Sequence, residues 1–263
     1  MTTRISPMSS PHGVGKVALE RALSKLGIAT RSDARRLVLA GRVALDGKVV
    51  RDPRLSVRPE TARFMVDGVP AIAPAKRVVM LLHKPAGVVT TRRDPEGRRT
   101  VYDLIQDAER HLVPVGRLDA ASTGLLLLTD DTRLADWLTD PRRAIPRVYL
   151  VTVRGRFKAL DAAAACAGVE DREELLQAHA VTIRKASGRE THLVVELRQG
   201  RNREIRRLCA ALGHEVTRLK RVSFGALELG DLVAGAWRWV PESELREAFP
   251  IWFTQSSTAR RTS

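Results

Sequence analysis

The feature that most limits the fold of this chain is a series of strand-like segments that follow one another with few helices between them. These segments are rich in Val, Leu and Thr, and many alternate in polarity: 77–91, 111–116, 124–130, 147–155, 179–186, 191–200 and 216–224. Helical patterns interrupt them only irregularly, at 132–138, 157–167, 202–212 and from Pro241 onward. Neighbouring strands without helical crossovers favour an antiparallel or mixed sheet over a doubly wound one. We therefore expect an α+β fold with a mixed, mainly antiparallel sheet.

Residues 16–41 have a different pattern, that of two short helices. The apolar positions of the first helix recur at three- and four-residue intervals: Leu19, Ala22, Leu23 and Leu26. Gly27 is placed to end this helix. Thr30 or Ser32 can cap a second helix, which Gly41 closes.

A hairpin is expected next, because Asp46 and Gly47 lie in the middle of segment 42–50 and suit a tight turn. Prolines then mark a stretch that we expect to be loosely structured: Pro53, Pro59, Pro70 and Pro74. We expect a domain boundary near Ala75. The chain then consists of a disordered tail, a small α/β domain, a larger domain and a second disordered tail: 1–15, 16–75, 76–253 and 254–263.

The 263 residues suffice for two domains, and their formal net charge is +15. Clustered Lys and Arg gain affinity for phosphate by displacing counterions, so this charge indicates RNA, DNA or an anionic membrane as partner. Part of the charge gathers on the second helix, its lead-in and the hairpin: Arg31, Arg35, Arg36, Arg42 and Lys48. Few acids interrupt this cluster, so we expect a phosphate-binding face.

Several classes of protein are disfavoured. Cys166 and Cys209 have neither metal-ligand spacing nor a disulfide framework, which points away from zinc and toward a reducing, cytoplasmic compartment. No apolar run approaches the ~20 residues that span a bilayer, so we expect no membrane partner. Neither a dinucleotide-binding glycine fingerprint nor a nucleophile elbow is present.

The stretch that most suggests chemistry is 116–131, GRLDAASTGLLLLTDD. Asp119 follows Arg117 on a turn that leads into the apolar run 125–128, which has the pattern of a central strand. Catalytic groups often lie on a loop held by such a rigid element. A loop aspartate more often serves only to form a turn. Further features of the sequence are therefore needed to distinguish a catalytic Asp119 from a turn residue.

A second basic region is 199–213, QGRNREIRRLCAALG. Asn202 is expected to cap a helix with the buried stripe Ile205, Leu208, Cys209 and Leu212. Basic side chains surround this stripe: Arg201, Arg203, Arg206, Arg207, Arg218, Lys220 and Arg221. Such a density of arginine indicates phosphate contacts or a guanidinium paired with a buried acid, for which Asp119 is the obvious candidate.

Asp130 and Asp131 permit a competing interpretation. The pair could hold a divalent metal, as in a nuclease, but it lies just before a helix, where capping is favoured. Asp119 needs no metal, because a carboxyl group with a reference pKa of ~3.9 is ionised at neutral pH and can attack without a helper base. On a basic protein this suits chemistry on a nucleoside drawn out of its stack.

Several ordered motifs together resemble the bacterial ribosomal pseudouridine synthases: 116–131, 147–151 and 200–221. Segment 27–48 resembles the RNA-binding domain of ribosomal small-subunit protein four, which precedes their catalytic domain. The resemblance covers residues 16–245. It implies an enzyme without cofactor or metal that isomerises a uridine of ribosomal RNA to pseudouridine, in a cleft of a mixed, mainly antiparallel sheet.

The resemblance also assigns roles to individual residues. Asp119 would be the essential carboxylate, attacking either the ribose or the base. Tyr149 would stack on the target base, and Leu219 would line the pocket. Arg206 would pair with Asp119, while Arg117 would help displace the uridine.

Arg147 stands where the family commonly has Lys, and Asp46 where the RNA-binding module more often has Asn. Segment 90–105 resembles members that act on large-subunit rRNA, so 23S rRNA, free or in an assembly intermediate, is the expected substrate. Nothing in the sequence demands more than a monomer. Two alternatives stay open: a noncatalytic RNA-binding or ribosome-assembly protein, and a metal-dependent nuclease built on Asp130 and Asp131.

Overall fold

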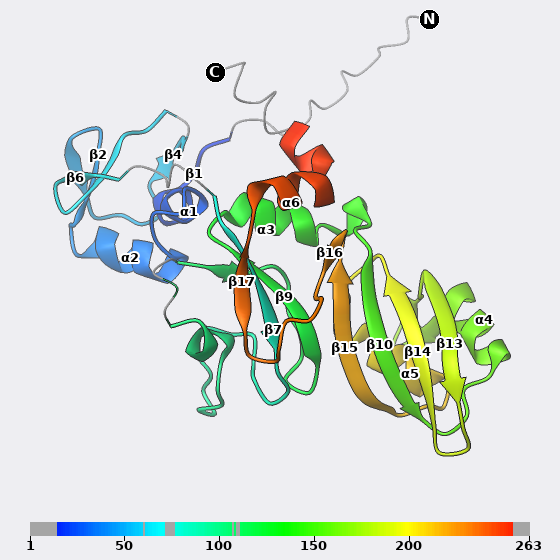
Figure 1. The fold of residues 1–263 in the computed structure, drawn as a ribbon. Helices are drawn as coiled ribbons and strands as arrows, with labels where there is room; N and C mark the ends of the chain where they lie inside the picture. Colours follow the sequence, from blue (N-terminus) through cyan, green and yellow to red (C-terminus); the bar gives the residue numbers. More distant parts are fainter. Residues whose placement is uncertain (1–14, 60, 72–76, 107, 109–110, 255–263) are drawn as a thin grey trace, which may run out of the picture. The chain divides into compact units, whose positions relative to one another are not determined.

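The computed structural model of the chain describes residues 15–59, 61–71, 77–106, 108 and 111–254 (Figure 1). The chain forms two compact units, residues 1–76 and 77–263. The domain boundary expected near Ala75 lies outside the described residues, as do nearly all residues of the two expected tails, 1–15 and 254–263.

The helices of the first unit begin and end where the capping residues predict. Helix α1 (Leu19–Lys25) is followed by Gly27, and helix α2 (Arg31–Leu39) by Gly41, with φ of +70° and +71°. Glycine adopts this left-handed conformation without a steric cost, so it terminates a helix well. The Oγ1 of Thr30 accepts a main-chain hydrogen bond of the first turn of α2, at 3.2 Å. Both predicted helices are confirmed.

The first unit also contains an antiparallel sheet in the order β3-β2-β5-β6 and a separate pair, β1 and β4. The strands are short: β1 (Val17–Ala18), β2 (Val43–Leu45), β3 (Lys48–Val50), β4 (Ser56–Val57), β5 (Phe64–Val66) and β6 (Val69–Pro70). The turn between β2 and β3 has φ of +50° at Asp46 and +82° at Gly47, so the predicted tight hairpin is confirmed.

The expectation of a loosely structured stretch after residue 50 is wrong, because β4, β5 and β6 lie within it. A second Asp-Gly pair, Asp67 and Gly68, makes the β5–β6 turn with φ of +54° and +77°. Phe64 of β5 is buried against the two helices' core residues, which fixes this strand. Pro70 is tolerated because β6 is the edge strand.

The second unit is built on a nine-stranded sheet in the order β13-β14-β10-β15-β9-β7-β17, with β8 paired to β9 and β16 to β15. Its strands are β7 (Val79–Lys84), β8 (Val113–Pro114), β9 (Thr123–Thr129), β10 (Arg147–Arg154), β13 (Ala180–Ala186), β14 (Glu190–Leu197), β15 (Val216–Phe224), β16 (Leu227–Glu228) and β17 (Trp237–Val240). The β9–β15 pair is parallel and the other pairs are antiparallel. The predicted mixed, mainly antiparallel sheet is confirmed.

The predicted helices of the second unit are present with shifted ends: α3 (Thr132–Thr139), α4 (Ala159–Ala167), α5 (Glu204–Ala211) and α6 (Glu242–Ala248). Short 3-10 turns follow Thr100 and Asp140: η1 (Val101–Leu104) and η2 (Pro141–Arg143). Four strands were not predicted: β16, β17 and the two strands of a hairpin, β11 (Val169–Asp171) and β12 (Glu174–Leu176).

The central strands are apolar on both sides because helices cover both faces of the sheet. On β9, Leu126 and Leu128 pack in a core with residues of α4 and α5, whereas Leu125 and Leu127 pack with residues of α3 and α6. In Figure 1, α3 and α6 lie together near the end of β9, apart from α4 and α5. The run of four leucines therefore reflects a strand buried on both faces.

The parallel contact between β9 and β15 brings the two strongest sequence motifs together. Gly124 of β9 lies opposite Arg221 of β15, and the φ of Gly124 is +108°. A Cβ at position 124 would lie 2.1 Å from the carbonyl oxygen of Arg221, so only glycine fits. This close approach joins the loop that carries Asp119 to the strand that carries Leu219.

Candidate active site

Most of the predicted site residues of the second unit lie around one cavity. Its walls come from the loop before β9, the first half of β10, the segment between β14 and α5, and β15. They include the predicted residues Arg117, Asp119, Tyr149, Arg201, Arg203 and Leu219, together with Arg147, Glu204 and Arg221. Arg206, predicted to belong to the same site, is not among the lining residues.

The loop that carries Asp119 is pinned by hydrogen bonds. Within the loop, the main-chain nitrogen of Ser122 donates to the carbonyl oxygen of Asp119 at 3.0 Å. The hydroxyl of Thr90 donates to the carbonyl of Leu118 at 2.9 Å. The carboxylate of Asp119 is thus held at the cavity by a rigid main chain, which suits a reacting group.

Lys84, at the end of β7, is a charged neighbour of the Asp119 loop that was not predicted from the sequence. It is completely buried, and its Nζ donates to the carbonyl oxygens of Pro85 (2.9 Å) and Ser122 (2.8 Å). Burial lowers the pKa of Lys84 to about 8, while the negative charge of Asp119 acts in the opposite direction. A single lysine at the end of the apolar run 78–82 is the signal that could have found it.

The ion-pair partner of Asp119 differs from the prediction. Among the described residues it is Arg203, whose Nη1 lies 3.5 Å from Oδ2 of Asp119. Arg206 instead donates to main-chain carbonyls, those of Val216 (2.9 Å) and Ala121 (3.4 Å). The expected Arg206–Asp119 pair is therefore wrong for this structure.

The start of α5 also differs from the prediction. Asn202 does not cap the helix as predicted; Arg203 occupies the N-cap position with a left-handed φ of +49° and no side-chain cap bond. Burial lowers the pKa of Arg206, and the positive charge of Arg203 acts in the same direction. The negative charge of Asp119 acts against them, so Arg206 and Asp119 still interact electrostatically. Arg206 thus bonds to the main chain of the Asp119 loop and not to the carboxylate of Asp119.

Tyr149 and Leu219 lie on neighbouring strands, β10 and β15. Leu219 is opposite Val151 in the β10–β15 register, and Tyr149 is opposite Arg221. Both side chains are buried and both line the cavity. An aromatic ring and an apolar side chain beside a carboxylate can hold a flat base and exclude water.

The cavity wall also contains three buried charged groups. Arg147 donates to the carbonyls of Ile145 (3.3 Å) and Leu138 (3.1 Å), and burial lowers its pKa. Arg221 donates through Nε to a carbonyl of β9 at 2.6 Å. Burial raises the pKa of the third group, Glu204. Of these, the sequence analysis noted Arg147 and the basic Arg221 but gave no role to Glu204.

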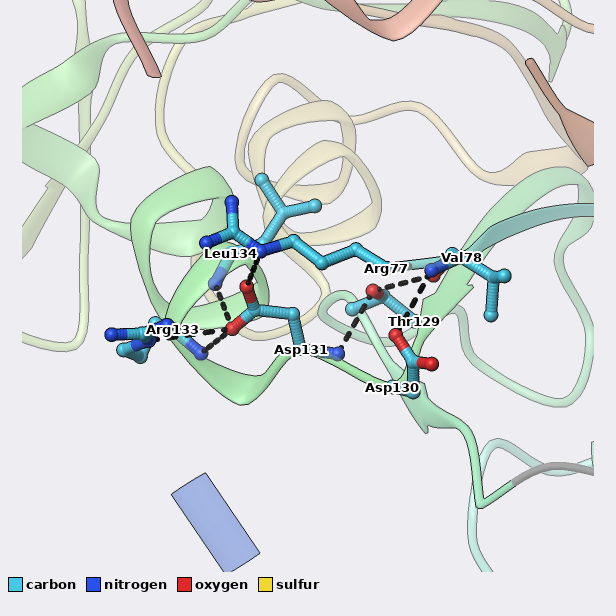
Figure 2. A network of polar contacts seen from close by, with 7 residues as sticks. All are labelled: Arg77, Val78, Thr129, Asp130, Asp131, Arg133 and Leu134. Atoms are coloured by element: carbon cyan, nitrogen blue, oxygen red, sulfur yellow. Dashed lines mark hydrogen bonds and ion pairs between the residues drawn. The ribbon is translucent and has the colours of Figure 1, made fainter. Parts of the chain in front are cut away.

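The acidic pair after β9 has a structural role (Figure 2). Oδ1 of Asp131 accepts from the main-chain nitrogens of Arg133 (2.9 Å) and Leu134 (3.3 Å), so Asp131 caps α3 as favoured by the sequence. Oδ1 of Asp130 accepts from the main-chain nitrogen of Val78 at 3.0 Å. The described residues contain no cluster of three or more His, Cys, Asp or Glu side chains suited to a metal ion. The cap at Asp131 and the hydrogen bond from Val78 to Asp130 give both acids of the pair a structural role.

The basic residues of the first unit are more involved in ion pairs than the sequence suggested. Arg31 and Arg35 contact Glu20 at 3.4 and 3.7 Å. Arg36 forms an ion pair with Asp33, and Arg42 forms one with Asp67. Lys48 is exposed. The arginines remain more than half exposed, so their guanidinium groups stay accessible to phosphate. No described helix is long and apolar enough to cross a membrane.

Comparison with protein families decides the class of this protein. The family model described as RNA pseudouridylate synthase matches residues 78–211, and the model of the S4 domain matches residues 19–62. The chain belongs to the RNA pseudouridine synthases. An RNA pseudouridine synthase of Aquifex aeolicus is 36% identical over 89% of this chain and 94% of its own. The ribosomal large subunit pseudouridine synthase B of Vibrio cholerae is 37% identical, covering 83% of this chain and 70% of its own.

The fold agrees with this family. A crystal structure of a pseudouridylate synthase superimposes with a TM-score of 0.60 at 25% identity, covering 88% of this chain and 98% of that one. The pseudouridine synthase match begins one residue before β7 and ends with the last residue of α5, so it includes Lys84, Asp119, Tyr149 and Arg206. Leu219 and Arg221 lie beyond the matched residues and join the site through β15.

Proposed function

We propose that this enzyme isomerises a specific uridine of ribosomal RNA, in the large-subunit 23S rRNA, to pseudouridine. The observation that carries the proposal is the placement of Asp119 in a cavity with Tyr149 and Leu219. The large-subunit substrate is supported by the name of the Vibrio cholerae relative and by segment 90–105. We infer further that the protein acts in the cytoplasm, as a monomer, on rRNA or on a ribosome-assembly intermediate.

The ionised carboxylate of Asp119 is the proposed nucleophile, attacking the ribose or the base of a flipped uridine. The bond between the ribose and the ring nitrogen breaks, the uracil turns, and a bond to ring carbon forms. The proton leaves that carbon and a ring nitrogen gains one, so the product is an isomer and no cofactor is consumed.

The surrounding residues have distinct proposed roles. Lys84 and Arg206 hold the main chain of the Asp119 loop, and Tyr149 supports the base by stacking. Leu219 excludes water from the opened sugar. Arg117 is exposed at the cavity and takes the place of the displaced uridine.

RNA binding is proposed for the remaining arginines. Arg201 and Arg203 border the cavity, where a guanidinium can contact the phosphates next to the flipped nucleotide. The first unit contributes the exposed face of Arg31, Arg35, Arg36, Arg42 and Lys48. Domain limits of 16–75 and 76–253 are part of this proposal.

The proposal is tested by mapping pseudouridines in rRNA from cells with and without the gene. We expect one uridine of 23S rRNA to lose its modification in the deletion strain, and purified protein to restore it on that strain's rRNA. Identical maps from the two strains would contradict the proposal. A missing site in 16S rRNA would retain the reaction and correct the substrate.

A further inference from the structure

Glu204 is a buried acid in the wall of the Asp119 cavity to which the proposed reaction gives no task. It is the first residue of α5 and only 3% exposed. Its Oε2 accepts the main-chain N–H of Arg201 at 3.1 Å. Its Oε1 is buried and has no hydrogen-bond partner among the described residues. A buried carboxylate oxygen is costly to leave unpaired, which points to a partner that arrives with the substrate.

Burial is the largest influence on the Glu204 carboxyl group, and it raises the pKa of this group. The N–H of Arg201 and the charges of Arg201, Arg147 and Arg207 act in the opposite direction but do not outweigh burial. An ionised carboxylate accepts hydrogen bonds and donates none. In its ionised form, Glu204 therefore needs an N–H or O–H donor at its free oxygen Oε1, and the proposal concerns this form.

A second unpaired atom in the same wall has the complementary character. Nη2 of Arg221 is buried without a hydrogen-bond partner, although Nε of the same side chain is bonded. A guanidinium can only donate, so this nitrogen demands an acceptor. Besides the hydroxyl of Ser122, which can donate or accept, the cavity wall thus contains an unpaired acceptor on Glu204 and an unpaired donor on Arg221, both residues being 3% exposed.

Uracil matches this pair of unfilled groups. Its outer edge carries one N–H, at ring nitrogen 3, between two carbonyl oxygens, whereas cytosine carries a bare, accepting nitrogen at that position. We propose that Glu204 selects uracil by accepting the N3–H of the flipped base through Oε1, with Arg221 donating to a ring carbonyl. This assignment rests on the proposed function and adds a specificity residue to it.

The test compares two RNA oligonucleotides that span the modified site and carry either uridine or 3-methyluridine at the target. The methyl group removes the N3–H and occupies its place. Product is measured after digestion by nucleoside chromatography, as kcat/KM for each substrate. The variants are Glu204→Ala and Glu204→Gln. Glu215→Gln is the control, since it makes the same chemical change at an exposed glutamate paired with Arg154.

We expect the wild type and Glu215→Gln to prefer uridine by roughly a hundredfold or more, because a site built around a substrate N–H rejects analogues that lack it. Glu204→Gln should lower kcat/KM for uridine by about tenfold or more, since its single oxygen is held by the Arg201 N–H. Glu204→Ala also makes room for the methyl group. The kcat/KM of this variant for uridine should therefore exceed its kcat/KM for 3-methyluridine by no more than about fivefold.

Loss of activity on both substrates in equal proportion, with the wild-type preference retained, would overturn the assignment and leave Glu204 a structural residue. Glu204→Gln keeps the shape of the side chain, so it decides the matter if the alanine variant does not fold. The wild-type rate on uridine tests the proposed function separately, because its absence would remove the reaction itself and this assignment with it.

Discussion

The acids at the two ends of strand β9 differ in what their oxygens contact. Asp131, after the strand, accepts two main-chain N–H groups and pairs with Arg77 at 2.7 Å, and Asp130 accepts the N–H of Val78. Asp119, before the strand, has the half-exposed Arg203 as its side-chain partner among the described residues, at 3.5 Å. The pair after the strand is occupied by its own fold, and the single acid before it is available for chemistry.

The surroundings of Asp119 show the same availability. Ser122, Glu204 and Arg221 of the cavity wall each keep a buried polar atom without a hydrogen-bond partner among the described residues. Native proteins tolerate few such atoms, and those that persist tend to serve a function. The main-chain hydrogen bonds and the short ion pair of Asp131, against the single 3.5 Å contact of Asp119, therefore separate the two acids more clearly than sequence position does.

The largest expected effect is that of Asp119→Asn. This substitution keeps the shape but removes the nucleophile, so kcat/KM should fall by roughly ten-thousandfold while RNA affinity stays within about threefold. Single-turnover assays and filter binding on the same RNA measure the two quantities. Asp131→Asn is the matched control and should keep the wild-type rate, since Asn caps a helix about as well as Asp. Similar losses in both variants would break the comparison.

The two arginines near Asp119 should differ in their effect. Arg206→Gln removes a partly buried group that donates to the carbonyls of Val216 and Ala121, and we expect kcat to fall by about a hundredfold. Arg203→Gln removes a half-exposed ion pair and should cost about tenfold at most, mainly in KM. Steady-state kinetics on the two variants checks this order, and the reverse order would assign the main support of Asp119 to Arg203.

Lys84 provides a prediction for stability against pH. Its pKa in the folded state, about 8, lies below that of an unfolded lysine, so the folded form releases its proton first. The unfolded chain therefore binds more protons between about pH 8 and 10, and stability should rise with pH in that window, by about 2 kcal/mol. Lys84→Met should lack this rise.

Denaturant titrations of the wild type and Lys84→Met at pH 7, 8, 9 and 10 provide the measurement. The difference between the two proteins isolates Lys84 from the other groups that titrate in this range. Parallel pH profiles would mean that Lys84 is less buried in solution than in the structure.

The smallest expected effect is on the structural side of the comparison. Asp131→Ala removes the cap of α3 and the partner of Arg77, and should lower the free energy of unfolding by about 1 kcal/mol. Thermal unfolding at pH 7 measures this change. Activity at 25 °C should equal that of the wild type; a catalytic defect in a folded Asp131→Ala protein would restore a chemical role to this acid.

Much of this contrast could be predicted from the sequence. The resemblance to the pseudouridine synthases predicted that Asp119, Tyr149 and Leu219 share one site, and all three line one cavity. The apolar run of β9 and the helix signal after it predicted the central strand and the cap at Asp131. These features depend on hydrophobic periodicity and capping, which act locally and leave a clear pattern.

The remainder depends on tertiary detail that no local pattern encodes. Which arginine contacts Asp119 is one such detail: Arg203, the left-handed N-cap residue of α5, contacts the carboxylate, whereas Arg206 donates to main-chain carbonyls. The burial of Lys84 and Glu204 depends on strands and helices that are distant in sequence. The β5–β6 hairpin was missed because prolines were given more weight than the Asp67–Gly68 turn signal.

The central claim, that the acid before β9 performs the chemistry and the acids after it do not, is tested most directly in cells. Chromosomal Asp119→Asn and Asp131→Asn strains are grown in parallel, and the pseudouridines of their 23S rRNA are mapped. The account predicts that the site lost in the deletion strain is also lost with Asp119→Asn and fully modified with Asp131→Asn. Full modification in the Asp119→Asn strain would contradict it.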